Sequence, residues 1–511
     1  MHTKAHTKSN ILYLSIIGKI ASWTMLSRVL GFVRDMLFAN LYGASYVLDA
    51  FLVAFKVPNF MRRFFSEGAM TQSFVPIYVK EMHQREKSKA LVTQCLVLLS
   101  VFLMIISTLV VCYPSAIIKL FAYGFIHDPQ RMTLACQMIR WTFPFLLMIA
   151  NVTLLSGVLN SHQSFGLPAA LPVLQNTCFI MGTYIGSSYF TNGMNLAISI
   201  PLAGLIELMV IYFACRTYIG PIGQWQWSTL KKIFTAMGII IGGAIFTQFN
   251  IVADTMFASF LNRGSISWLY YADRLINLPI GVIAVSISTL LLPQFSSAIG
   301  RNDKETVANL TLWGIKVALA SCVPCIIFLC FFGEQALILL FYHGAFSAKD
   351  IHMTYLALFA MSIGLPGFML NKVFNTLFYA HQVVKTPTYI ACISAVFAIA
   401  MNIVMIPYLG HVALALTLSI VALLQCIILC YLAHKQSWFD ISIADFKLWS
   451  VAFLLLLIFA ALLKTLSPQL SWWLNAHILM RLQSIVILGG LIVLVYVALL
   501  KKMGLLSELK S

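Results

Sequence analysis

Long apolar runs alternate with short polar breaks along almost the whole chain. A membrane-spanning α-helix needs about 20 mostly apolar residues, and such runs recur from one end of the sequence to the other. The runs and the glycine, proline and charged residues between them predict about fourteen transmembrane helices. The predicted spans are residues 11–38, 46–78, 91–113, 133–158, 168–190, 195–215, 233–261, 265–297, 307–332, 351–379, 387–407, 411–433, 447–464 and 481–500. The pattern therefore predicts an all-α, polytopic membrane protein.

The composition agrees with this pattern. Hydrophobic residues make up 60% of the chain and charged residues 10%, which excludes an ordinary soluble domain. Residues 1–10 are polar and the apolar run after them is longer than a signal sequence requires, so we expect no cleavable signal peptide. The eleven cysteines are scattered through apolar runs. We interpret them as small apolar side chains.

Lysine and arginine positions predict how the chain is oriented. With the N-terminus inside, the inside segments carry about 17 of these residues and the outside segments about 6. The excess of positive charge on one side predicts that both termini are cytoplasmic, which an even number of spans allows. The net charge of +17 is therefore better explained by membrane orientation than by nucleic-acid binding.

Short motifs recur in the same order about 220 residues apart, a period that contains six spans. Residues 120–124 (LFAYG) match residues 340–344 (LFYHG), and each motif precedes a span with a central proline. The other pairs are His162-Gln163 with His381-Gln382 and residues 74–76 with residues 291–293. Six spans restore the same orientation, so we predict two parallel six-helix lobes, which is a transporter architecture. The predicted divisions are an N-lobe (1–217), an amphipathic linker (218–232), a C-lobe (233–434) and two C-terminal helices (435–511).

Ionisable side chains gather in the first two predicted spans. An ionisable group at bilayer depth costs at least ~2.5–3.5 kcal/mol, so it normally faces a partner or a wet cavity. Arg28 and Asp35 are seven residues apart and share nearly one helical face, as do Asp49 and Lys56. Structural ion pairs therefore stay an alternative to a binding site for Asp35, Asp49 and Lys56. The full cluster is Arg28, Arg34, Asp35, Asp49, Lys56, Arg62, Arg63 and Glu67, and its last two members predict a local ion pair.

The corresponding spans of the second half carry fewer charges, namely Asp254, Asp273 and Arg274. The acidic residues within reach do not neutralise all the bases of the two halves. Arginine stays charged and binds phosphate through two parallel hydrogen bonds, which suits a pyrophosphate. We therefore predict an anion site formed by Arg28, Arg34, Arg62 and Arg274, with Asp35, Asp49, Asp254 and Asp273 as cavity or coupling acids.

Other polar residues have less specific positions. Asn371 and Asn375 lie one turn apart and fit either a cavity, an ion site or a hydrogen bond between helices. Glu207 in the sixth span is equally compatible with a site and with a structural role. His162 and His381 fall in predicted cytoplasmic loops, where we expect them to be solvated.

The sequence contains no HExxH, GxSxG, Walker A or DxD motif. We therefore expect a membrane transporter rather than an enzyme, with no cofactor. Since no nucleotide-binding loop is present, an ion gradient, the membrane potential or a substrate gradient would drive transport.

Three segments resemble a known family: residues 27–35 (SRVLGFVRD), residues 49–78 (DAFLVAFKVPNFMRRFFSEGAMTQSFVPIY) and residues 257–293 (FASFLNRGSISWLYYADRLINLPIGVIAVSISTLLLP). The chain is similar over nearly its whole length to the MurJ (MviN) lipid II flippases of the multidrug/oligosaccharidyl-lipid/polysaccharide exporter superfamily. The resemblance implies alternating access in the bacterial cytoplasmic (inner) membrane. The substrate would be the undecaprenyl-pyrophosphate-linked peptidoglycan precursor, moved from the cytoplasmic to the periplasmic leaflet for peptidoglycan synthesis.

The resemblance also implies roles for individual residues. The family's essential cavity arginines fall on Arg28, Arg34, Arg62 and Arg274, their acidic partner falls on Asp49, and Lys56 also matches a family position. Asn277 stands where some relatives carry a glutamate. A sodium ion near Asp254, with Asn371 and Asn375 as further ligands, would lack part of the set found in some relatives, so sodium, a proton or the membrane potential are all kept as driving forces.

Lipid II and the bilayer are the implied partners, with a groove beside the last two helices for the lipid tail. Other cell-wall synthesis and division proteins are further candidates, and no nucleic acid is expected. Two alternatives stay open: a flippase for another polyprenyl-linked glycan, and a multidrug cation antiporter of the same superfamily. A basic cavity disfavours the antiporter, because organic cations need acidic surroundings. A non-transporting scaffold would not need buried arginines.

Overall fold

The computed structural model describes the backbone of residues 2–64, 70–440 and 443–505 and the side chains of residues 18–64, 70–242, 252–440 and 447–505. Glu67, the predicted partner of Arg63, lies outside these ranges. The described part of the chain is helical and contains no β-strand. Its contacts divide it into two compact units, Met1–Arg263 (unit 1) and Gly264–Ser511 (unit 2).

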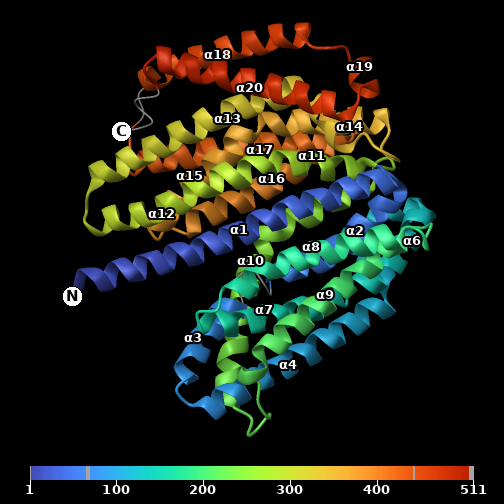
Figure 1. Cartoon of the computed structure of the whole chain (residues 1–511), viewed down its shortest axis with the longest axis vertical. Helices are drawn as coiled ribbons and strands as arrows, with labels where there is room; N and C mark the ends of the chain where they lie inside the picture. Colours follow the sequence, from blue (N-terminus) through green and yellow to red (C-terminus); the bar gives the residue numbers. More distant parts are fainter. Residues whose placement is uncertain (1, 65–69, 441–442, 506–511) are drawn as a thin grey trace. The chain divides into compact units, whose positions relative to one another are not determined.

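Unit 1 consists of ten α-helices and two short 3₁₀ turns in its described part (Figure 1). They are α1 (His2–Tyr42), α2 (Tyr46–Phe64), α3 (Met70–Glu81), α4 (Arg85–Cys112), α5 (Pro114–Phe121), η2 (Tyr123–His127), α6 (Pro129–Thr142), α7 (Phe145–Ser161), α8 (Gly166–Gly186), α9 (Met194–Cys215), η3 (Arg216–Tyr218) and α10 (Trp227–Ser259).

Unit 2 contains the remaining helices. They are α11 (Ser265–Pro279), the π-helical turn η4 (Ile280–Ala284), α12 (Val285–Gly300), α13 (Lys304–Phe341), α14 (Ala348–Ile363), α15 (Leu365–Ala380), α16 (Lys385–Leu409), α17 (His411–Lys435), α18 (Ile443–Leu466), α19 (Leu470–Asn475) and α20 (Ile478–Lys502). The last long helices, α18 and α20, lie side by side and pack against α13 (Figure 1).

Every predicted span coincides with one helix or one broken helix. Among the described residues, nine helices are long and apolar enough to cross a membrane, and ten if the pair α14–α15, bent by 43°, is one span. The other four predicted spans fall on α1, α2 with α3, α8 and α10. The helix α2 is not among the nine apolar helices because it carries the charged residues Asp49, Lys56, Arg62 and Arg63 within 19 residues. The predicted all-α polytopic fold is confirmed.

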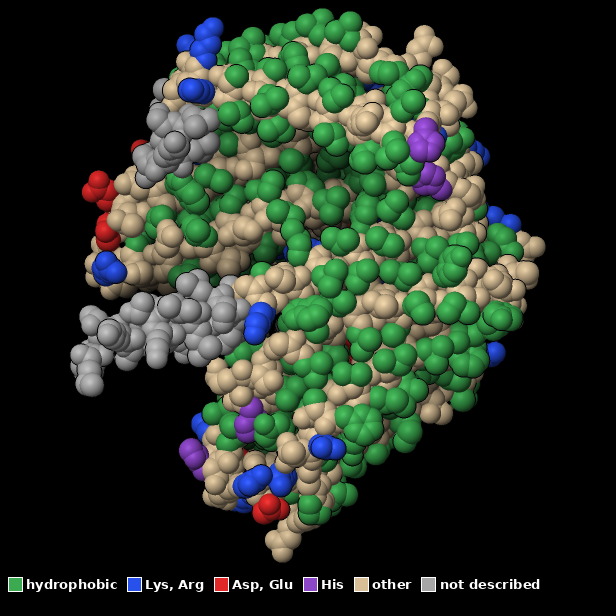
Figure 2. Space-filling model, in the orientation of Figure 1, with side chains coloured by type: hydrophobic (Ala, Val, Ile, Leu, Met, Phe, Trp, Pro, Cys, Tyr) green, Lys and Arg blue, Asp and Glu red, His purple; other side chains and the backbone are tan. Residues whose placement is uncertain are grey.

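Apolar side chains cover much of the face of the molecule that Figure 2 shows. On α4 and α20 exposed leucine, isoleucine, valine and methionine side chains lie on faces that pack against no other helix. A helix that is hydrophobic on its outer face as well as its inner face is typical of a protein surrounded by lipid. The exposed faces of these helices therefore support membrane embedding.

A proline breaks the hydrogen bonding of α2. Pro58 has no backbone N–H, so the carbonyl of Ala54, four residues earlier, loses its helical donor. The hydroxyl of Thr142 on α6 donates to this carbonyl at 3.0 Å, and the bond is fully buried. The hydroxyl of Thr142 thus joins α6 to α2 at the carbonyl that lacks a hydrogen-bond donor within α2.

The internal repeat is visible in the turns that follow α7 and α15. Gln163 and Gln382 both have a left-handed backbone with φ 60°. Each turn also begins with a histidine directly after its helix, and the preceding helix in each unit, α6 or α14, ends next to Pro144 or Pro366. The same local conformation at equivalent positions supports the two parallel repeats predicted from the motifs.

The two repeated histidines are stacked on aromatic rings. His162 lies over Tyr218 with ring centroids 4.0 Å apart and shares a hydrogen bond with the hydroxyl of Tyr78, while His381 lies over Trp438 at 3.9 Å. Burial lowers the pKa of both histidines below the ordinary value. The expectation that they are solvated holds only in part, because both side chains are half-buried and an aromatic residue from later in each repeat covers one face of the ring.

The predicted lobe boundaries stay a prediction. The helix α10, assigned from sequence to the C-lobe, packs against α2, α3, α5 and η2, and the contact-based division falls after Arg263. Asp254 on α10 therefore lies in unit 1. Residues 219–226, within the predicted linker, contain no helix.

Candidate functional site

Arg34 on α1 is held in a defined orientation within unit 1. Its Nε and Nη2 donate to Oδ1 of Asp35 at 3.1 and 2.8 Å, and its Nη1 donates to Oδ1 of Asn176 on α8 at 3.0 Å. The guanidinium also lies 5.6 Å from the ring centroids of Phe38 and Phe179. The side chain of Asp35 is 1% exposed and that of Arg34 is 12% exposed. The cation is therefore oriented by its neighbours yet keeps access to solvent.

Asn176 joins α8 to α1 beside this arginine. Its Nδ2 donates to the carbonyl of Ser27 at 3.1 Å, to the hydroxyl of Ser27 at 3.2 Å and to the carbonyl of Pro172 at 3.0 Å. All its polar atoms are thus used between the two helices. The sequence analysis missed this residue, although an asparagine inside an apolar run, four residues after a proline, was a usable signal.

The carboxylate of Asp49 on α2 is fully buried. Its Oδ2 lies 3.9 Å from Nη1 of Arg131 on α6, whose side chain is 7% exposed. A buried ion pair of this kind is strongly destabilised when one partner is removed. The structural alternative for Asp49 is thereby supported, with a partner that the sequence did not suggest.

Asp128 completes this charged group at the start of α6. It caps the helix by accepting the backbone N–H of Arg131, and it also accepts from Nε of Arg131 at 2.9 Å and from Nε and Nη2 of Arg263 at 2.7 and 2.9 Å. Burial by itself would raise the pKa of Asp128, but the hydrogen bonds and charges of Arg263 and Arg131 outweigh it and hold the pKa below the ordinary value. The dipeptide Asp128-Pro129 was the sequence signal, as a typical N-cap and first helical residue.

The remaining predicted residues of unit 1 differ in exposure. Arg28 is exposed, whereas Lys56, Arg62 and Asp254 are half-buried. The Nε of Arg62 donates to Oδ1 of Asn59, one turn earlier on α2, at 3.2 Å. The cations Arg28, Lys56 and Arg62 lie on α1 and α2, the helices predicted to carry most of the anion site.

In unit 2 the predicted cation Arg274 lies on α11. Its Nη2 donates to the hydroxyl of Tyr270 at 2.9 Å, and its guanidinium carbon lies 4.7 Å from the centroid of the same ring. Asp273 is exposed, and its backbone carbonyl accepts from the side chain of Asn277 at 2.8 Å. Tyr270 was not among the predicted site residues, although both its hydroxyl and its ring contact the arginine.

The predicted ion ligands of the second half do not form a metal cluster. Nδ2 of Asn371 donates to the carbonyl of Ala422 at 2.9 Å and joins α15 to α17, while Asn375 is half-buried. Within the described residues no group of three or more His, Cys, Asp or Glu side chains could hold a metal ion. The sodium ion proposed near Asp254 stays a prediction.

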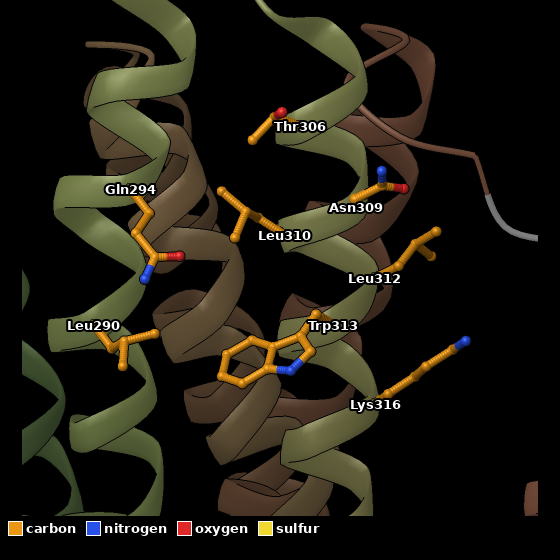
Figure 3. Close-up of a pocket in the computed structure, with 8 residues that line it drawn as sticks. All are labelled: Leu290, Gln294, Thr306, Asn309, Leu310, Leu312, Trp313 and Lys316. Carbon is orange, nitrogen blue, oxygen red and sulfur yellow. The ribbon is translucent and has the colours of Figure 1, made fainter. Parts of the chain in front are cut away.

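A cavity of about 600 Å³ lies in unit 2 between α12 and α13 (Figure 3). Leu310 and Trp313 point from α13 toward α12, and Lys316 extends from another side of α13. No predicted site residue lines this cavity, so it is not the predicted anion site. Its lining consists of Leu290, Gln294, Thr306, Asn309, Leu310, Leu312, Trp313 and Lys316.

Helices of membrane-spanning length, two similar halves and charged side chains on α1, α2 and α11 are typical of a polytopic transporter. Comparison with known proteins identifies the family. The family model described as lipid II flippase MurJ matches residues 38–483. The chain therefore belongs to the MurJ family, and it is a multi-pass transporter of the inner membrane rather than an enzyme.

Known relatives are similar in sequence to this chain over most of their length. The chain is 32% identical over 460 residues to the probable lipid II flippase MurJ of Buchnera aphidicola subsp. Acyrthosiphon pisum, covering 89% of this chain and 90% of that protein. It is 32% identical over 510 residues to the probable lipid II flippase MurJ of Vibrio cholerae serotype O1, covering 96% of both chains.

Solved structures of other transporters have a similar fold. A lipid II flippase MurJ in an inward closed conformation superposes with a TM-score of 0.80 at 26% identity, covering 94% of this chain and 98% of that one. An inward-facing multidrug resistance transporter of the MATE family superposes with a TM-score of 0.65 at 14% identity, covering 82% of this chain and 97% of that one. The second likeness is one of fold alone.

Proposed function

We propose that this chain moves lipid II, the undecaprenyl-pyrophosphate-linked peptidoglycan precursor, from the cytoplasmic to the periplasmic leaflet by alternating access. The observation that carries the proposal is the match of the lipid II flippase family to residues 38–483, which includes α2, α11 and most of the helices between the termini. The four predicted arginines supply the chemistry, since a guanidinium is matched to a phosphate in charge and geometry.

The structure of unit 1 supports the role of Arg34 in particular. Asp35 and Asn176 fix its guanidinium by three hydrogen bonds, so little side-chain entropy is lost when an anion binds. In unit 2 the hydroxyl of Tyr270 fixes Arg274 in the same way. Each unit thus offers an oriented cation, and we propose that the pyrophosphate engages cations of both units in turn as access alternates.

Charge also supports the direction of transport. Both termini are proposed to be cytoplasmic, from the excess of lysine and arginine in the inside segments. A negative headgroup that moves outward is favoured by a membrane potential that is negative inside, by about 2.3 kcal/mol per charge per 100 mV. No cofactor is needed, and the potential or a coupling ion would supply the energy.

The test is complementation of a bacterium depleted of its own flippase. Arg274→Ala and Arg28→Ala should abolish growth while the protein level stays normal, and Arg140→Ala is the matched control. Arg140 is an exposed arginine of α6 that belongs to no predicted site. Growth supported equally by all three variants would contradict the assignment of the arginines.

A second readout separates this substrate from other lipid-linked glycans. Lipid II exposed on the outer leaflet should fall when the protein is depleted and recover when the wild-type chain is restored. Unchanged exposure in cells with no other lipid II flippase would remove the proposal. A defect confined to another polyprenyl-linked glycan would transfer the function to that substrate.

A further inference from the structure

The end of α10 is held within unit 1 by polar contacts. Residues 259–263 comprise the last residue of this helix and the turn after it, and we call them the latch segment. The hydroxyl of Ser259 accepts the backbone N–H of Gly124 in η2 at 2.9 Å, in a buried hydrogen bond. A Cβ atom on Gly124 would lie 2.5 Å from the backbone N of Phe260, so the two backbones are in direct contact, which only glycine permits.

Two arginines extend this contact on either side of Asp128. Nη1 and Nη2 of Arg131 on α6 both donate to the carbonyl of Leu261 at 3.2 Å. Nε and Nη2 of Arg263 donate to the carboxylate of Asp128 at 2.7 and 2.9 Å. The guanidinium carbon of Arg263 also lies 5.3 Å from the ring centroid of Tyr46, at the start of α2. The latch segment is therefore bound by η2, α6 and α2, all within unit 1.

The two sides of this contact differ in burial. The side chains of Arg131 and Asp128 are 7% and 10% exposed, and they bind each other within α6 without the help of Arg263. The side chain of Arg263 is 48% exposed. A half-exposed ion pair is exchanged for water at little cost, whereas a buried one is not. The acceptor side is thus a fixed part of α6, and Arg263 is the part that can leave.

The helix α10 connects the two repeated halves of the chain. The repeat makes it the first helix of the second half, whereas the structure packs it against α2, α3, α5 and η2 of the first half. Its end is followed directly by Gly264, where unit 2 begins. Alternating access moves the two halves of a transporter against each other. The chain must then either release the end of α10 or bend beyond it.

We propose that the latch segment leaves Asp128 and Arg131 when access alternates, and that Arg263 is a positioning residue that holds one of the two access states. The inference rests on the proposed function, since that function supplies the two states. The latch is closed in this structure. Arg263 does not contact the substrate but sets the ratio of closed to open latch. Salt that screens its ion pair must lower this ratio, as loss of the charge does.

The experiment measures the distance between the latch segment and α6 in the full-length protein in lipid nanodiscs. Keto amino acids at the exposed positions Gln130 and Asn262 carry nitroxide labels, so the native cysteines stay unlabelled. Pulsed electron resonance should resolve a short distance for the closed latch and a longer one for the open latch. Arg263→Gln should lower the ratio of closed to open latch about two- to fivefold, and Arg263→Lys should restore part of it.

Ionic strength separates a latch from a contact that only supports the fold. Raising the salt concentration from about 0.1 M to about 1 M shortens the screening length from about 10 Å to about 3 Å. The ratio of closed to open latch should fall in the wild type and stay nearly constant in Arg263→Gln. Arg140→Gln is the matched control, because Arg140 is an exposed arginine of the same helix outside the latch. It should leave the ratio and its salt dependence unchanged.

The latch and the proposed function fail in different ways. A ratio that neither Arg263→Gln nor salt changes, including a single short distance throughout, would overturn the inference. If the chain still complements a flippase-depleted bacterium in that case, the proposed function stands and the chain bends beyond residue 263. If the chain does not complement but the latch opens as described, the substrate assignment fails and the latch stands, because alternating access does not depend on which lipid is carried.

Discussion

Thr142 and Pro58 offer a sharp test of how unit 1 is held together. Pro58 deprives the carbonyl of Ala54 of its helical donor, and the hydroxyl of Thr142 replaces that donor at 3.0 Å. Thr142→Val keeps the shape of the side chain and removes the hydroxyl. Pro58→Ala restores a backbone N–H at position 58, so that the carbonyl can be satisfied within α2. The two changes should therefore not be independent.

The magnitude follows from the burial of the bond. Hydrogen bonds between membrane helices average about 0.6 kcal/mol and reach about 1.7 kcal/mol, whereas a buried polar group left unsatisfied costs about 1–3 kcal/mol. Ala54 and Thr142 are both fully buried, so no lipid headgroup or solvent can replace the donor. We expect Thr142→Val to cost about 1.5 kcal/mol in the wild-type background, roughly tenfold in the unfolding equilibrium. In the Pro58→Ala background it should cost almost nothing.

The assay is equilibrium unfolding in mixed micelles, followed by labelling of buried thiols. Cys95 and Cys215 are both buried in unit 1 and become reactive when it opens. Four proteins complete a double-mutant cycle: the wild type, the two single variants and the double variant. A coupling energy within about 0.5 kcal/mol of zero would show that the two sites act independently. The proposed replacement of the helical hydrogen bond would then be refuted.

Two further predictions concern charge. Asp128→Ala should lower the free energy of unfolding by about 3 kcal/mol, because it removes the cap of α6 and leaves the buried guanidinium of Arg131 poorly paired. Arg263→Gln is the control, because the side chain of Arg263 is half-exposed, and it should change the free energy of unfolding little. Equal effects of the two variants would contradict this explanation by burial. Burial lowers the pKa of His162 and His381 below about 6.5, so the stability they contribute is present above that pH and is lost as the pH falls through the lowered pKa values; unfolding measured from about pH 7.5 to about pH 5.5 should show this loss, and the double variant His162→Phe/His381→Phe should lose less.

The helices were predictable because their signal is local. A membrane span is a continuous apolar run, and each of the predicted runs became one helix or one broken helix. The breaks were also local in origin, since Pro58, Pro144 and Pro366 lie inside or directly beside them. The repeat was detectable for the same reason, as it depends on short motifs rather than on contacts.

Ion pairing was less predictable, because it depends on which helices touch. Helical spacing suggested Asp49 with Lys56, and the structure adds Arg131, more than eighty residues away, at 3.9 Å from Asp49. Asp35 accepts from Nε and Nη2 of the adjacent Arg34, whose Nη1 donates to Asn176 on α8. The spacing of residues along α1 or α2 does not show that α8 or α6 packs against them.

The sequence by itself determined that this chain is a polytopic, all-α member of a transporter family with a dense cluster of charges on its first two spans. The length of an apolar run, the position of a proline and the net charge can be read from the sequence alone, so they do not depend on how the helices pack. Tertiary structure alone decided the surroundings of each charge, because burial and hydrogen-bond partners are set by helix packing. It was packing that fixed Arg34 between Asp35 and Asn176, placed an aromatic ring over His162, and enclosed Glu207 within unit 1.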